Sequence, residues 1–180
     1  MFDRDRFIAD CKAAIGEGQQ AIREVVSRAV SDPASVIREM GEPGNAGIVR
    51  LYRSEELTIM HFIWAPYMCL VPHNHNMFSV VGLYAGREDN AFWRRTNGSI
   101  ELVSGQSLGA GQVVTLARYI IRAIGNPIGK KTSAFHVYGG DFLAPDDQRS
   151  QWDHETLSER PWNLSEVKDR FREFDSRYSL

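Results

Sequence analysis

The stretch VPHNHNMFSVVGLYAGREDN, residues 71–90, decides how the rest of the chain can be organised. Residues 78–84 are rich in the aromatic and β-branched side chains that strands favour. His73 and His75 stand just before them, two positions apart, so in an extended backbone their side chains point to the same side. Pro72 restricts the backbone immediately ahead of the pair. We therefore expect two imidazoles at the start of a strand, close enough to share one metal ion.

The segment around this stretch, residues 46–145, has the pattern of many short strands with no helix between them. Turn signals such as Asn97-Gly98 and Asn126-Pro127 separate the strands. This order favours a sandwich or a closed jelly-roll barrel over a parallel sheet with crossover helices. The expected strands are residues 48–52, 57–64, 78–84, 91–95, 99–103, 112–116, 120–124 and 134–138.

Helices are expected at both ends of the chain. In residues 1–45 apolar side chains recur every three or four positions, and Asp32 before a proline is a typical helix start. In the tail, residues 146–180, Asn163 can cap a helix and Glu166 completes a capping box. We expect this last helix to lie against the outside of the barrel.

Length and composition exclude several classes of protein. The 180 residues suit a single domain with a substantial core, residues 1–180. Lys and Arg number 21 against 23 Asp and Glu, so we expect no nucleic acid as a partner. No apolar run is long enough to span a membrane, so we expect no membrane as a partner. The N-terminal residues lack the apolar core of a signal peptide. Two cysteines suit a reducing compartment, so we expect a cytoplasmic protein. Such barrels often pair, so a homodimer is expected.

Three segments carry a resemblance to a known family. Residues 72–88 resemble the first motif of the cupins, a His-x-His before a strand that ends in glycine. Residues 136–142 look like the second motif, and residues 111–116 look like the glycine-led strand between them. More narrowly, the segments are similar to the cysteine dioxygenase-like branch, the thiol dioxygenases and their bacterial relatives. The resemblance covers roughly residues 48–145 and implies a mainly β fold, a jelly-roll barrel known as the double-stranded β-helix.

The resemblance also implies a function and a set of site residues. In that branch three histidines hold one ferrous ion, and a small thiol and oxygen bind at its open positions. His73 and His75 match the first two ligands, with Fe(2+) or another divalent metal such as Ni, Zn or Mn expected. His136 and Tyr138 match a second group beside the metal, and Arg53 is the nearest match to the arginine that holds the substrate carboxylate. The implied protein is an oxygenase whose small-molecule substrate is a thiol or a related carboxylic acid.

One position departs from the family. The third histidine is replaced by Arg122, which offers no lone pair and whose fixed charge opposes a nearby dication. Three outcomes remain open: His136 joins His73 and His75 as a metal ligand, another ligand or water completes the site, or the metal is absent. The alternative function is a non-catalytic or metal-free cupin that binds a small anion through Arg122 and Arg53. A sugar isomerase of the same fold, with histidine and tyrosine as base and acid, is a third reading.

Three further residues have less specific readings. Cys69 lies close to the histidine pair and is either a thiolate ligand or a buried, unreactive thiol, which its apolar neighbours favour. His61 is expected to be a hydrogen-bonded histidine within the barrel. Glu88 is expected to join a solvated charge cluster at the end of a strand.

Overall fold

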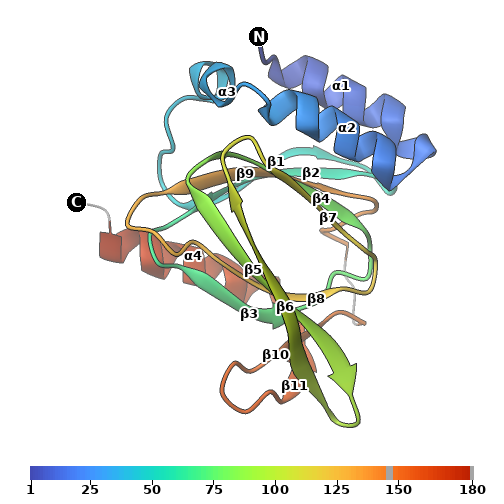
Figure 1. Ribbon diagram of the computed structural model, residues 1–180, viewed down its shortest axis with the longest axis vertical. Coiled ribbons are helices and arrows are strands. Elements are labelled where there is room, and N and C mark those ends of the chain that lie inside the picture. The colour runs from blue at the N-terminus through green and yellow to red at the C-terminus, as the bar shows by residue number, and fades with distance from the viewer. Residues whose placement is uncertain (145–147, 179–180) are drawn as a thin grey trace.

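The chain folds into two facing antiparallel sheets with helices packed around them (Figure 1). The computed structural model describes residues 1–144 and 148–178. The strands are β1 (Gly47–Arg53), β2 (Thr58–Trp64), β3 (Cys69–His73), β4 (Ser79–Ala85), β5 (Arg87–Thr96), β6 (Ser99–Gly109), β7 (Val113–Leu116), β8 (Ile121–Gly125), β9 (Thr132–Tyr138), β10 (Ser150–Trp152) and β11 (Glu159–Pro161). The helices are α1 (Arg4–Ala14), a 3₁₀ turn (Ile15–Glu17), α2 (Gln19–Val30), α3 (Pro33–Met40) and α4 (Leu164–Tyr178).

The strand order makes this a jelly-roll arrangement. One sheet has the order β1-β2-β9-β4-β7 and the other has the order β11-β10-β3-β8-β5-β6. Neighbours in both sheets are antiparallel, and several of them are far apart in sequence, as in β2 with β9 and β5 with β8. The expected fold class, mainly β with helices at both ends, is confirmed. Within the described residues no helix combines the length and the apolar character needed to cross a membrane.

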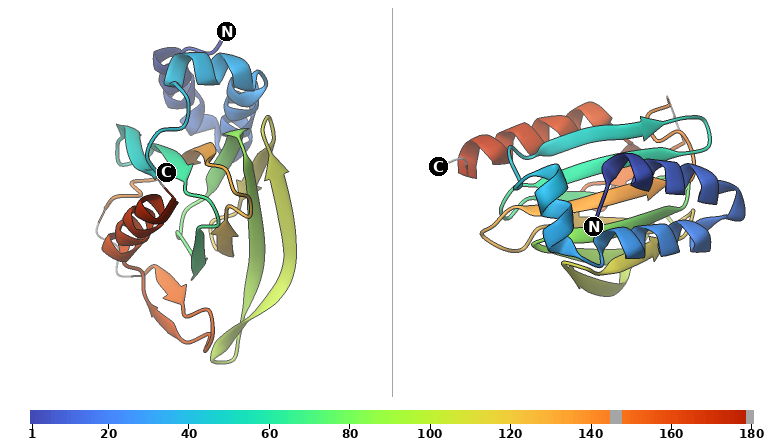
Figure 2. Two further views of the ribbon diagram at one scale, coloured as in Figure 1. Left: turned by 90° about the vertical axis from the view of Figure 1, so that its left-hand side faces the viewer. Right: turned by 90° about the horizontal axis from the view of Figure 1, so that it is seen from above.

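Strand β9 is buried along its whole length because it has a core on each face. Phe135 and Val137 point toward the N-terminal helices, where they join the apolar cluster that contains Phe7 and Ile22. Tyr138 lies in a second apolar cluster, which contains Phe62 and Trp64 and lies between the two sheets. Alternation along a strand sends neighbouring side chains to opposite faces, so one strand serves both cores. Figure 2 shows the N-terminal helices, α1 to α3, lying over the outer face of the first sheet.

The helical ends follow their sequence signals in part. Asp32 caps α3, with its carboxylate accepting from the Ser35 backbone N–H, and Asn163 caps α4 in the same way through Ser165. Helix α4, however, does not lie against the outside of a finished barrel. Phe171 packs on Trp64 with a ring separation of 5.1 Å, in the cluster between the sheets. The helix closes one side of the barrel, because its apolar stripe supplies part of the inner core.

Three short strands depart from the expected pattern. The histidine pair was expected at the start of a strand, but His73 ends β3 and His75 lies in the following loop, with β4 beginning at Ser79. Strands β10 and β11 fall within the tail that was expected to be helical, and β10 pairs with β3. These three strands have only three to five residues each, which leaves little periodic pattern to recognise in the sequence.

The close approach of α2 to the first sheet depends on a glycine in β4. A Cβ added at Gly82 would lie 2.4 Å from Cγ1 of Val26 and 3.1 Å from Cγ1 of Val30. Both valines are β-branched and stiff at χ1, so they cannot turn aside cheaply. Gly82→Ala should therefore lower the free energy of unfolding by about 1–3 kcal/mol through overpacking, measured by urea denaturation. Gly44→Ala is the control, since a Cβ there meets no atom within 4 Å. Equal urea midpoints for the two variants would contradict this packing.

Candidate functional site

Four strand or loop segments bring the candidate residues to one internal cavity. His73 comes from β3, His75 from the loop after it, Arg122 from β8, and His136 and Tyr138 from β9. His73 and Arg122 are direct cross-strand partners. The cavity is about 10 Å³, at the lower limit for one water molecule. It is lined by Ile48, Phe62, Trp64, Leu70, His73, His75, Arg122, Ile124, His136, Tyr138, Phe142, Trp162, Leu164 and Val167.

The two histidines of the His-x-His stretch lie together and present lone pairs. Their ring centres are 4.9 Å apart. Nδ1 of His73 donates to the backbone carbonyl of Val71 over 2.8 Å, which leaves Nε2 as the ring nitrogen with the lone pair. Burial, helped by the charge of Arg122, lowers the pKa of His73 to about 3. Burial also lowers the pKa of His75 well below its usual value, so both rings are neutral at pH 7.

Arg122 is the charged centre of the cavity and is only 2% exposed. Its Nη1 donates to Oδ1 of Asn90 over 2.9 Å, and the Asn90 amide donates to Oε1 of Glu88 over 3.0 Å. The same Glu88 oxygen is 3.7 Å from Nη1 of Arg122. Burial raises the pKa of Glu88 and the Arg122 charge opposes that rise. Because a buried guanidinium needs a counter-ion, we take Glu88 as ionised. Nε of Arg122 has no hydrogen-bond partner.

His136 and Tyr138 form a second polar pair on the opposite wall. Nδ1 of His136 and the Tyr138 hydroxyl share a hydrogen bond of 3.2 Å. Nε2 of His136 lies 3.8 Å from Oε2 of Glu88, and neither atom has a hydrogen-bond partner. Phe62 stacks on the imidazole with a ring separation of 4.1 Å. Burial lowers the pKa of His136 and raises that of Tyr138, so at pH 7 the imidazole is neutral and the phenol is protonated.

The donor set fits a metal ion only in part. His73 and His75 are buried, neutral and adjacent, as metal-binding imidazoles must be. The position opposite His73 holds Arg122, whose charge would oppose a dication. The third expected ligand, His136, directs Nε2 toward Glu88. Across the described residues no three His, Cys, Asp or Glu side chains are grouped as a metal site. The arrangement therefore lacks the third ligand of a three-histidine centre.

Arg53 and Cys69 are not brought to the cavity. Arg53 donates two hydrogen bonds of 2.8 Å to the carboxylate of Asp141 and is not among the cavity-lining residues. Cys69 is exposed, so the expectation of a buried thiol is wrong. Its side chain lines a groove on the outer face of the second sheet, where it cannot reach an ion held inside the barrel. Alternation along β3 separates Cys69 from Leu70, and the register shift between Leu70 and His73 brings His73 to the same inner face as Leu70.

Sequence reasoning missed Glu88 and Trp162. Glu88 was expected in a solvated cluster, but it is fully buried, while its neighbour Asp89 forms the exposed pair with Arg87. Alternation along β5 could have placed Glu88 on the inner face. Trp162 packs on His73 in a tilted arrangement with a ring separation of 4.7 Å. Trp162 reaches the cavity from the segment that follows β11. Its place there depends on how that segment packs on the barrel, which no local pattern in the sequence indicates.

Trp162 also separates the cavity from an outer cleft. The cleft is about 530 Å³ and lies along β10 and α4. Its lining shares Leu70, Trp162 and Val167 with the inner cavity. A ligand larger than water must displace one of these side chains to enter. Trp162 contacts the rings of both His73 and His75, with ring separations of 4.7 Å and 6.3 Å, and so covers the histidine pair on this side.

Comparisons with known proteins give similarities to solved structures only. No family model matches the chain, and no curated protein matches it. A solved RmlC-like cupin from Methanocaldococcus jannaschii, with a double-stranded β-helix fold, has a TM-score of 0.48 and 13% identity over 58% of this chain and 87% of its own. A cupin superfamily protein from Desulfitobacterium hafniense has a TM-score of 0.44 and 13% identity over 56% of this chain and 83% of its own.

A third similarity is to an enzyme. A variant of oxalate decarboxylase from Bacillus subtilis has a TM-score of 0.44 and 13% identity, over 56% of this chain and 27% of its own. Of these three solved structures, two are described as cupins and one is an enzyme. The fold assignment rests on the strand order of the chain itself, and the chemistry of the cavity rests on the chain's own residues.

The buried charge cluster can be tested through stability. Glu88→Gln should lower the free energy of unfolding by about 3 kcal/mol, because it leaves the Arg122 cation buried without a counter-ion. The double variant Glu88→Gln with Arg122→Met should recover most of that loss. Glu101→Gln breaks the exposed pair with Arg94 and should cost less than about 1 kcal/mol. Urea denaturation at pH 7 measures all three. A Glu88→Gln variant as stable as the native protein would mean that Glu88 is protonated in the fold.

Proposed function

We propose that the barrel cavity binds a small carboxylic acid, held by the guanidinium of Arg122. The observation that carries the proposal is the burial of Arg122 among neutral rings, with its Nε lacking a hydrogen-bond partner. A buried donor without an acceptor is costly, and a ligand carboxylate would satisfy it. Guanidinium and carboxylate can pair through two parallel hydrogen bonds, which gives orientation as well as affinity.

The rest of the lining suits the other end of such an acid. Ile48, Leu70 and Ile124 are apolar and favour a short hydrocarbon body. The Tyr138 hydroxyl and the free ring nitrogen of His73 are neutral hydrogen-bonding groups. A substituent such as a thiol or hydroxyl could contact them without carrying charge. The ligand class is therefore a small acid with one polar substituent and few carbon atoms.

Glu88 opposes this binding and sets its strength. Its carboxylate is 3.7 Å from Nη1 of Arg122, so an incoming anion and Glu88 compete for one cation. Both charges would lie in a medium of low dielectric constant, where like charges repel strongly. Acid binding should therefore improve when the charge of Glu88 is removed, while removal of the Arg122 charge should weaken it.

Calorimetric titration with 3-mercaptopropionate, propionate and propionamide tests the proposal. The two acids should bind and the neutral amide should not. Arg122→Gln should weaken acid binding about tenfold or more, the worth of a charge-assisted hydrogen bond. Glu88→Gln should bind the acids more tightly than the native protein, and the acids should raise its melting temperature. Arg94→Gln, an exposed arginine outside the cavity, is the control. Equal binding of acid and amide, or an unchanged Arg122→Gln, would refute the proposal.

A second candidate function is a metal-dependent oxygenase, similar to the thiol dioxygenases and acting on a small thiol. The observation that favours it is the preformed pair of His73 and His75, with the His73 ring oriented by the Val71 carbonyl. Oriented imidazoles of this kind are typical of metal ligands. Arg122 stands where the third metal ligand is expected and cannot bind a metal ion. This function therefore needs a further ligand at that position, such as water or the substrate.

Metal analysis separates the two functions. Under the first proposal, protein purified without chelators and then incubated with Fe(2+) should retain no stoichiometric metal. Arg122→His should retain about one ion per chain, because three imidazoles would then surround the site. Elemental analysis by mass spectrometry gives both numbers. About one iron in the native protein, with oxygen uptake on adding 3-mercaptopropionate or cysteine, would favour the oxygenase instead.

A further inference from the structure

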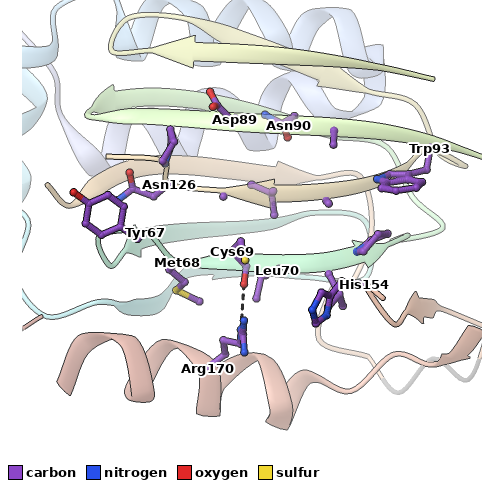
Figure 3. Close-up of a pocket in the computed structure, with 17 residues that line it drawn as sticks. Tyr67, Met68, Cys69, Leu70, Asp89, Asn90, Trp93, Asn126, His154 and Arg170 are labelled. Carbon is purple, nitrogen blue, oxygen red and sulfur yellow. Dashed lines mark hydrogen bonds between the residues drawn. The ribbon is translucent and has the colours of Figure 1, made fainter. Parts of the chain in front are cut away.

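A second hollow lies outside the barrel, on the outer face of the second sheet. Figure 3 shows a groove there. Strands β3, β8 and β5 form its floor, and α4 forms one side. Its volume is about 500 Å³, within the range of small-molecule sites. Tyr67 stands at one end of the groove and Trp93 at the other (Figure 3). Of the residues that line the barrel cavity, only Leu70 and Ile124 also border the groove, and so does Asn90, the partner of Arg122.

The groove exists because the outward side chains of the central strands are small. Ala91 on β5 and Ala123 with Gly125 on β8 form its floor. A Cβ at Gly125 would come within 3.2 Å of the backbone oxygen of Met68, so the strands meet closely there. Along β3 the groove follows residues 69–72, a distance of about 10 Å for three steps of about 3.3 Å. The floor is thus long, narrow and apolar, which suits an unbranched hydrocarbon chain.

Two polar side chains of the groove are already paired, and one buried donor is not. The carboxylate of Asp89 is already paired with Arg87. The Asn126 amide donates to two backbone carbonyls, and its oxygen accepts from the Ile128 N–H. The indole N–H of Trp93 has no hydrogen-bond partner. Donors without acceptors favour an anionic ligand over a cationic one.

Arg170 supplies the positive charge. It is exposed on α4, and its Nε donates to the backbone oxygen of Cys69 over 3.2 Å (Figure 3). Among residues 1–144 and 148–178 no carboxylate pairs with its guanidinium, whereas Arg172 and Arg177 on the same helix pair with Asp169 and Glu173. The hydrogen bond to the sheet fixes Arg170 beside the floor of the groove, so its charge is positioned in advance.

We propose that this groove binds an unbranched monocarboxylate of medium chain length, the anion of a fatty acid. The hydrocarbon chain lies over Ala91, Ala123 and Gly125, and the carboxylate pairs with Arg170. The apolar floor alone would also suit a second copy of the protein, but a preplaced cation and an unpaired indole N–H favour an anionic head group. The site is separate from the barrel cavity and does not depend on the function proposed for that cavity.

Calorimetric titration with sodium decanoate, below its micelle concentration, tests the site. Native protein should bind decanoate and should bind neither butyrate nor decyltrimethylammonium. Arg170→Gln should weaken binding about tenfold, as expected for loss of a charge-assisted contact. Ala123→Leu should weaken it by about tenfold or more, because the added side chain points outward and fills the floor. Arg172→Gln is the matched control on the same helix and should change affinity by less than about twofold.

Further measurements distinguish this site from the other surfaces. Arg122→Gln should leave decanoate binding unchanged, so its loss in that variant would place the ligand in the barrel and overturn the proposal. Equal binding of decyltrimethylammonium, or unaltered binding by Arg170→Gln and Ala123→Leu, would also overturn it. Size-exclusion chromatography is run on each variant, together with a thermal melt. A dimer that Ala123→Leu dissociates would show that a second copy covers the groove, and would refute a fatty acid site.

Discussion

The interaction on which the cavity depends is the buried contact of Arg122 with Asn90 and Glu88. A guanidinium that is 2% exposed cannot lose its charge, so the surrounding chain must neutralise and hydrogen-bond it. Asn90 does this directly, and Glu88 does it from 3.7 Å. The charge in turn helps to keep His73 and His136 neutral. The cavity thus contains one permanent cation, at the position where the resemblance in the sequence led us to expect a histidine.

This cluster is positioned by strand pairing. Arg122 on β8 lies opposite His73 on β3 and opposite Phe92 on β5, so it is held between two neighbouring strands. Alternation along β5 then sends Glu88 and Asn90 to the same inner face as Arg122. The same alternation leaves small residues on the outer face, where they form the floor of the groove beside α4. One sheet therefore has a charged, closed interior and an open, apolar exterior.

The helices complete both sites for different reasons. Helix α4 buries Val167, Phe171 and Phe174 against the inner core and so closes one side of the barrel. On its other side it presents Arg170 to the outer groove. The N-terminal helices cover the first sheet and leave its inner face to the cavity (Figure 2). The closed state of the cavity follows from α4 and Trp162, since the two sheets alone would leave that side uncovered.

The sequence by itself determined eight of the eleven described strands, the helix caps at Asp32 and Asn163, and the presence of an arginine where the third histidine was expected. These features depend on alternation, on capping and on motifs within a few residues, all of which are local. Only the tertiary structure decided the partners of Arg122, since Asn90 is 32 residues away, and the exposure of Cys69. It also decided the position of Trp162 over His73. Such contacts depend on the register of strands far apart in the chain, and a shift of one residue would move each side chain to the opposite face.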